Sequence, residues 1–167
     1  IHTYEPTPED IMKIKQCDIF VYGGGESDKW ADNILNTVDE NVRIIRMMDV
    51  VELYETEHHH GEADEEHLHE DKKEYDEHVW TSPLNAIKIV KAIRDALITC
   101  DSENADYYRE NANAYIGELQ LLDSRFADLF DAAYTKPIIV GDRFPFRYFA
   151  ERYSISYFSA FPGCSAQ

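Results

Sequence analysis

The sequence is poor in positive charge. Its 167 residues include 16 lysines and arginines against 33 aspartates and glutamates, which gives a formal net charge of −17. Such a chain repels nucleic-acid phosphates and anionic membrane surfaces, which argues against both as partners, whereas cations are attracted. The sequence also lacks an apolar run of the roughly 18–20 residues that a membrane span needs, which argues against a transmembrane helix.

Several common chemical signatures are also missing. The three cysteines form no C-x-x-C motif, so we expect unpaired thiols, with one disulfide plus one free thiol as the alternative in an exported protein. The glycine run 23–25 lacks the Gly-Lys-Ser/Thr order of a phosphate loop, and we interpret it as a flexible strand-to-helix turn. The sequence has neither a Gly-x-Ser-x-Gly nor a His-Glu-x-x-His motif, which argues against the two corresponding hydrolase classes.

Apolar residues make up 44% of the chain, enough for a core, and they alternate between short runs and helical periodicity. Buried strands are predicted at 18–22, 42–48, 137–141 and 156–161, because each is a short apolar stretch. Thr7-Pro8 and Ser82-Pro83 combine an N-cap residue with a first-turn proline, which is typical of a helix start. This alternation predicts an α/β fold in which helices flank parallel sheets.

One predicted helix is unusually long. It follows the cap Asp101-Ser102-Glu103, and its roughly 30 residues would measure about 45 Å at a rise of 1.5 Å per residue. It could be a coiled-coil segment or a rigid rod between two lobes, and we favour the rod because strand–helix units lie on both sides. The chain then divides into a first lobe (1–100), a linking helix (101–134) and the start of a second lobe (135–167). The apolar stripe of the helix, with spacings of four and three residues, is Tyr108, Ala112, Tyr115, Leu119, Leu122, Phe126, Leu129 and Ala133.

A strongly acidic, histidine-rich segment interrupts the first lobe. Residues 55–78 hold eleven acidic residues, two lysines and six of the seven histidines, with almost no apolar side chains. We interpret 55–77 as a long loop, because it cannot bury enough surface to offset its ordering entropy. The loop is either a solvated acidic insertion or a segment that gathers metal ions through its histidines, which are His58, His59, His60, His67 and His69.

Three motifs, in this order, resemble the metal-specific solute-binding proteins of bacterial ABC importers, the zinc and manganese receptor family. The resemblance covers nearly the whole chain and implies two α/β lobes joined by one long helix. A histidine- and acid-rich loop just before the second motif is typical of zinc-type members. The motifs are His2-Thr3-Tyr4-Glu5-Pro6-Thr7-Pro8, then Asp76-Glu77-His78-Val79-Trp80 followed by Pro83 and Asn85, and finally Tyr148-Phe149-Ala150-Glu151-Arg152-Tyr153.

The resemblance also implies a metal site in the cleft between the lobes. The family takes one histidine from each of the first two motifs, here His2 and His78. Its third ligand, usually a histidine, comes from the loop before the Tyr-Phe-Ala helix, where this sequence has Asp142 and Arg143. Guanidinium stays protonated and is no ligand, so Asp142 is the candidate, with helix capping or an arginine pair as its alternative role. Imidazole and carboxylate suit Zn²⁺, and Mn²⁺ is the weaker-binding alternative.

The resulting prediction is a non-enzymatic extracytoplasmic receptor, periplasmic or a cell-surface lipoprotein, that passes Zn²⁺ or Mn²⁺ to an ABC permease. The family's opening strand–helix–strand and its fourth ligand have no counterpart here. We therefore expect an internal fragment with both lobes incomplete, whose open sheet edges favour self-association. Two alternatives stay open: a metal-dependent surface adhesin or interaction protein, and a metal-dependent hydrolase that uses His2, His78 and Asp142 to activate water.

Overall fold

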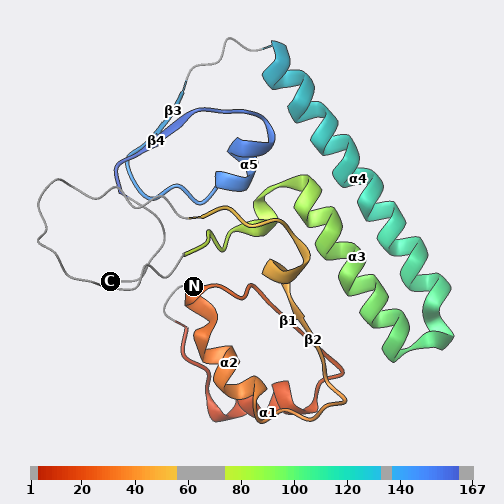
Figure 1. The fold of residues 1–167 in the computed structure, drawn as a ribbon. Coiled ribbons are helices and arrows are strands. Elements are labelled where there is room, and N and C mark those ends of the chain that lie inside the picture. The colour runs from red at the N-terminus through yellow and green to blue at the C-terminus, as the bar shows by residue number, and fades with distance from the viewer. Residues whose placement is uncertain (1–3, 56–73, 133–136, 162–167) are drawn as a thin grey trace, which may run out of the picture.

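Helices alternate with short strands near both ends of the described chain, and two long helices follow each other in its middle (Figure 1). The computed structural model describes residues 4–55, 74–132 and 137–161. Short 3₁₀ turns η1 (Glu26–Asp28), η2 (Met47–Val50), η3 (Val79–Thr81) and η4 (Ser102–Asn104) join several of the main elements. The main elements are α1 (Pro8–Gln16), β1 (Ile19–Tyr22), α2 (Lys29–Leu35), β2 (Arg43–Arg46), α3 (Pro83–Cys100), α4 (Ala105–Ala132), β3 (Ile138–Val140), α5 (Arg147–Arg152) and β4 (Tyr157–Ser159).

Two strand–helix–strand units carry the strands. β1 pairs in parallel with β2, with Ile19 opposite Arg43, and α2 makes the crossover between them. β3 pairs in parallel with β4, with Ile138 opposite Tyr157, and α5 makes that crossover. Parallel neighbours need such a crossover, because a tight turn cannot join them. The two units lie apart from each other, and α3 and α4 run side by side along the molecule (Figure 1). The predicted α/β class with parallel sheets and flanking helices is confirmed.

Both predicted helix starts are present, but only Thr7 forms the side-chain cap that its residue type predicts. Thr7 and Asp10 form a capping box, in which the Thr7 backbone N–H donates to Asp10 Oδ2 at 2.9 Å and the Asp10 N–H donates to Thr7 Oγ1 at 3.3 Å. Hydrogen bonds from Thr7 lower the pKa of Asp10 to about 2. Ser82 is the N-cap of α3 and Pro83 its first residue, but the Ser82 side chain makes no capping hydrogen bond.

The long helix α4 is confirmed, but its buried face differs from the predicted stripe. With 28 residues it is about 42 Å long, and it returns along α3 (Figure 1). Tyr115, Leu122 and Leu129 of the predicted stripe are exposed. A strict seven-residue repeat drifts by about 20° per heptad around a straight helix, so a stripe read in heptads leaves the contact face. The side chains of α4 that are buried or half-buried are Ala105, Tyr108, Ala112, Ile116, Leu119, Asp123, Phe126, Ala127 and Phe130.

The helix α3 lies between two clusters of buried apolar side chains. Ile87 packs with Ile116 and Leu119 of α4. Two residues further on, Ile89 belongs to a second cluster. Burying side chains of this size contributes about 1.5–3 kcal/mol each. The second cluster includes Tyr148 of α5, so the second strand–helix–strand unit packs against α3 and against the turns η2 and η3. Its buried members are Met48, Val79, Ile89 and Tyr148.

Two smaller expectations concern cysteines and membrane spans. Cys17 and Cys100 are free thiols, as expected, and Cys164 lies outside the described residues. Within residues 4–55, 74–132 and 137–161, no helix combines the length and the apolar character of a bilayer span.

Candidate metal centre

His78 lies directly before η3 and is buried, with 8% of its surface exposed. Its Nδ1 is 2.9 Å from Asp76 Oδ1, and its backbone N–H donates to the same oxygen at 2.8 Å. Because a carboxylate oxygen only accepts, Nδ1 carries the hydrogen and the lone pair of the neutral ring is on Nε2. A carboxylate that fixes the tautomer and orientation in this way is the usual companion of a metal-binding histidine.

The residues after His78 hold its backbone in place. Val79 is fully buried in the core, and the Thr81 backbone N–H and hydroxyl donate to the His78 carbonyl at 3.1 and 2.8 Å. The Trp80 ring, half-exposed, lies 5.7 Å from the His78 ring between centroids. The alternation of buried and exposed side chains follows from the turn, which points Val79 into the protein and Trp80 outward. The histidine is therefore fixed through both its ring and its main chain.

Glu77 connects His78 to the glycine turn after β1. Its carboxylate is buried, accepts the Ser27 hydroxyl at 2.8 Å, and accepts the Ser27 backbone N–H at 3.3 and 3.4 Å. A Cβ on Gly25 would lie 2.5 Å from the Glu77 Cβ, so only glycine allows this close approach. Gly24 has a φ of +98°, which side-chain-bearing residues rarely adopt. The glycine run is therefore a strand-to-helix turn, as predicted, and its place beside Glu77 explains its composition.

Asp142 lies on the exposed loop between β3 and α5. Its Oδ1 accepts the backbone N–H of Arg143 at 2.7 Å. It does not cap the following helix, because the N-cap of α5 is Phe146. The capping role that the sequence left open is therefore wrong. Its role as a metal ligand stays a prediction.

The other predicted ligands lie outside the described residues. This applies to His2 of the first motif and to all five loop histidines. Among residues 4–55, 74–132 and 137–161, no three His, Cys, Asp or Glu side chains gather into a group able to hold a metal ion. The described part of the chain thus supplies one oriented histidine, and the ligand set stays a prediction. The five loop residues are His58, His59, His60, His67 and His69.

Sequence reasoning did not assign roles to three residues that support His78. Asp76 fixes the ring, Glu77 holds the segment to the glycine turn, and Tyr148 donates to the Asp76 carbonyl at 2.8 Å. An aspartate two residues before a histidine is a signal that could have identified Asp76. The contacts of Glu77 and Tyr148 link residues 50 and 72 positions apart, which no local pattern reveals.

Comparisons with known proteins agree on one family. The family profile described as ZnuA, zinc-uptake complex component A periplasmic, matches residues 1–167. Zinc-binding lipoprotein AdcA of Streptococcus pneumoniae is 34% identical over 161 residues, which are 92% of this chain and 31% of that protein. High-affinity zinc uptake system protein ZnuA of Bacillus subtilis is 33% identical over 158 residues, which are 92% of this chain and 48% of that protein.

Solved structures give the same result. Zn(II)-bound AdcA from Streptococcus pneumoniae superposes with a TM-score of 0.76 at 30% identity, over 99% of this chain and 32% of that one. The Zn(II)-bound ZnuA-like domain of the same protein gives a TM-score of 0.75 at 31% identity, over 96% of this chain and 55% of the domain structure. The chain thus spans about a third to a half of the length of these relatives. Because the family profile covers every residue and the folds agree, the chain belongs to the ZnuA family of zinc-uptake components.

Proposed function

We propose that this chain is part of an extracytoplasmic receptor that captures Zn²⁺ between two lobes and delivers it to an ABC permease. The observation that carries the proposal is the buried His78, whose Nδ1 is held by Asp76 at 2.9 Å. Such a pair presents neutral imidazole nitrogen to a borderline metal ion. The relatives named above as zinc-binding support zinc over Mn²⁺, and so does the lower general affinity of nitrogen and oxygen sites for Mn²⁺.

His2 is proposed as the second ligand because the chain next to it and the chain next to His78 touch two adjoining elements, α2 and the 3₁₀ turn η1 that precedes it. Tyr4, two residues after His2, packs edge-on against Trp30 of α2 with 5.2 Å between ring centroids. Ser27, three residues before Trp30, holds Glu77. An extended chain covers about 3.3–3.6 Å per residue, so each histidine is separated by only a short stretch from this pair of adjoining elements, η1 and α2.

Asp142 and the loop histidines complete the proposal. Asp142 is exposed, so its second carboxylate oxygen is accessible to a ligand, and it lies on the loop that leads into α5. The histidines between residues 58 and 69 would gather the ion near the cleft.

Self-association of the chain also stays a prediction. Large apolar side chains on the strands favour it, with Ile139 and Phe158 81% and 64% exposed.

A binding role accounts for the site better than catalysis. A hydrolase needs a general base beside a metal-bound water, and the buried carboxylates near His78 are already engaged, Asp76 with the ring and Glu77 with Ser27. The relatives are named as zinc-binding and zinc-uptake proteins, which favours a receptor without catalytic activity. Location in the periplasm or at the cell surface follows from the same role.

Calorimetric titration with Zn²⁺ and with Mn²⁺ tests the proposal on three proteins: the wild type, His78→Ala, and a variant with alanine at all five loop histidines. We expect His78→Ala to weaken the tightest zinc site by at least about 100-fold, since loss of an outer-shell partner alone costs about 10–100-fold. The loop variant should keep that site and lose only weaker binding. Equal zinc affinity in wild type and His78→Ala would contradict the proposal.

A further inference from the structure

The two ends of the histidine-rich segment are held together immediately before His78. Glu55 and Tyr75 form an antiparallel bridge, and the Asp76 backbone N–H donates to the Tyr54 carbonyl at 3.0 Å. We call residues 54–55 and 75–76 the neck. His78 follows the neck by two residues, and the Asp76 carboxylate that orients its ring is itself part of the neck. The geometry of the neck therefore sets the position of the histidine.

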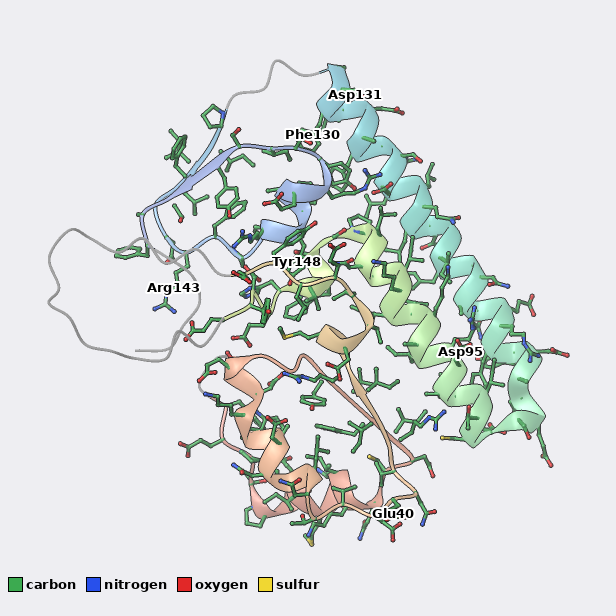
Figure 2. The ribbon with its side chains drawn as sticks, viewed as in Figure 1. Glu40, Asp95, Phe130, Asp131, Arg143 and Tyr148 are labelled. Atoms are coloured by element: carbon green, nitrogen blue, oxygen red, sulfur yellow. The ribbon has the colours of Figure 1, made fainter. Side chains whose placement is uncertain are left out.

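Two neighbouring side chains of α5 contact both strands of the neck. The Tyr148 hydroxyl donates to the Asp76 carbonyl at 2.8 Å and accepts the Tyr54 backbone N–H at 3.4 Å. The Arg147 guanidinium donates to the Glu55 carbonyl and lies over the Tyr54 ring, 5.9 Å from its centroid. Figure 2 shows Tyr148 in the middle of the molecule, between α5 and the chain that leads into α3. Each strand of the neck is thus hydrogen-bonded from the second lobe.

Tyr148 is rigidly held, which is what a positioning role requires. Its side chain is 1% exposed and belongs to the core cluster with Met48, Val79 and Ile89. Its ring lies 5.1 Å from the Tyr54 ring between centroids. Desolvation raises the pKa of its phenol to about 12, so the hydroxyl keeps its hydrogen at neutral pH and remains a donor. Because the ring cannot shift without disturbing the core, the Asp76 carbonyl is held against a fixed point.

We propose that Tyr148 is a positioning residue of the metal site: its hydroxyl clamps the two strands of the neck and so fixes Asp76, which orients His78. This inference rests on the proposed zinc function. In this proposal the second lobe helps to position His78 of the first lobe. This role is separate from any metal ligand that the second lobe donates itself. Loss of the hydroxyl would free the Asp76 main chain, and with it the carboxylate that aims the imidazole.

Tyr148→Phe tests the clamp, because it removes the hydroxyl and keeps the ring in the core. Tyr153→Phe is the matched control. Tyr153 is the C-cap residue directly after α5, and its hydroxyl donates to Asp123 of α4 at 2.9 Å, away from the neck. Zinc affinity is measured by competition with a chelating dye, and the backbone exchange of Asp76 and His78 by hydrogen–deuterium exchange. We expect about 10-fold weaker zinc binding and faster exchange in Tyr148→Phe. Tyr153→Phe should change the zinc affinity by less than twofold.

The outcomes separate the clamp from the proposed function. Wild-type zinc affinity in Tyr148→Phe, with binding still lost in His78→Ala, would overturn the clamp and leave the zinc proposal intact. Equal affinity in wild type, Tyr148→Phe and His78→Ala would overturn both. Arg147→Gln is the second variant if Tyr148→Phe does not fold: it removes the hydrogen bond to Glu55 from a side chain outside the core cluster. We expect it to weaken zinc binding about threefold, and an unchanged affinity would overturn the clamp.

Discussion

Two adjacent acidic residues, Asp76 and Glu77, have separate tasks beside His78. Asp76 hydrogen-bonds the imidazole, whereas Glu77 holds Ser27 in the turn after β1. Each buried carboxylate accepts at least two hydrogen bonds, which offsets the cost of removing it from water. The histidine is consequently supported by chain segments from three places in the sequence. A rigid support of this kind would keep the proposed ligand His78 in one orientation before an ion arrives.

Gly25 gives a prediction about this support. Gly25→Ala would place a Cβ 2.5 Å from the Glu77 Cβ and 2.5 Å from its Oε2, so the His78 segment must move away from the turn. We expect a loss of about 2 kcal/mol in the free energy of unfolding, measured in urea, together with weaker zinc binding. Gly117→Ala is the control: its Cβ would meet nothing within 4 Å on the helix α4, so it should stabilise by about 0.5–1 kcal/mol. Unchanged stability of Gly25→Ala would contradict the prediction.

The residues that the sequence identified and those that it missed differ in the range of their contacts. His78 stands in a motif that is identified by its resemblance to a known family, whereas Thr7 and Asp10 form a box of four residues that local spacing reveals. The Ser27–Glu77 and Asp76–Tyr148 hydrogen bonds connect residues that are 50 and 72 positions apart in the sequence. In the sequence, the residues that form these hydrogen bonds look like ordinary polar residues. They become important because the folded chain buries them.

At the scale of elements, α4 is joined to α5 by a charged pair inside an aromatic cluster. Asp123 accepts Arg152 Nε at 2.9 Å and Nη2 at 2.6 Å, and it also accepts the Tyr153 hydroxyl at 2.9 Å. Phe130, labelled in Figure 2, lies 5.8 Å from the Phe149 ring of α5 between centroids. These contacts explain why the charged residue Asp123 lies on the buried face of α4, where the periodicity of the sequence predicts apolar residues only. They join α4 to the second unit, while its other packing is against α3, so the rod interpretation stays a prediction.

Asp123→Asn tests this link. Hydrogen bonds from Arg152 lower the pKa of the Asp123 carboxyl, so its stabilising contribution is present above the ordinary aspartate value of about 3.9 and is lost as the pH falls below it. We expect Asp123→Asn to lose about 2 kcal/mol at pH 7, less than a fully buried pair would, because the Arg152 side chain is 35% exposed. In urea unfolding, the difference from wild type should shrink at pH 3. Asp128→Asn, at an exposed position of the same helix, should match wild type at both pH values.

At the scale of the whole molecule, one core cluster joins α5 to α3 and to the turns η2 and η3, so these parts are expected to unfold together. Tyr148 packs against Met48 from η2 and Val79 from η3. The sequence predicted the strands, the helices and their parallel order, because hydrophobic periodicity and caps are local. It did not predict this junction, because Tyr148 stands in an aromatic run whose members look alike. Phe146 of the same run is half-exposed, whereas Tyr148 is fully buried.

Cooperative unfolding through this junction predicts a loss of stability at alkaline pH. The folded pKa of Tyr148 is raised to about 12 by burial, and that of Tyr153 is raised by burial and by its hydrogen bond to Asp123. Above pH 10, the ordinary tyrosine value, the unfolded chain releases protons that the folded chain keeps, so the free energy of unfolding falls as the pH rises toward 12. For Tyr148 the loss approaches about 2 kcal/mol over that range, since each unit of pKa is worth about 1.4 kcal/mol.

Urea unfolding between pH 8 and pH 11 should give a shallower dependence of the free energy of unfolding on pH for Tyr148→Phe than for wild type. The exposed-site control Tyr107→Phe should keep the wild-type slope, and equal slopes for all three would show that this junction does not govern unfolding.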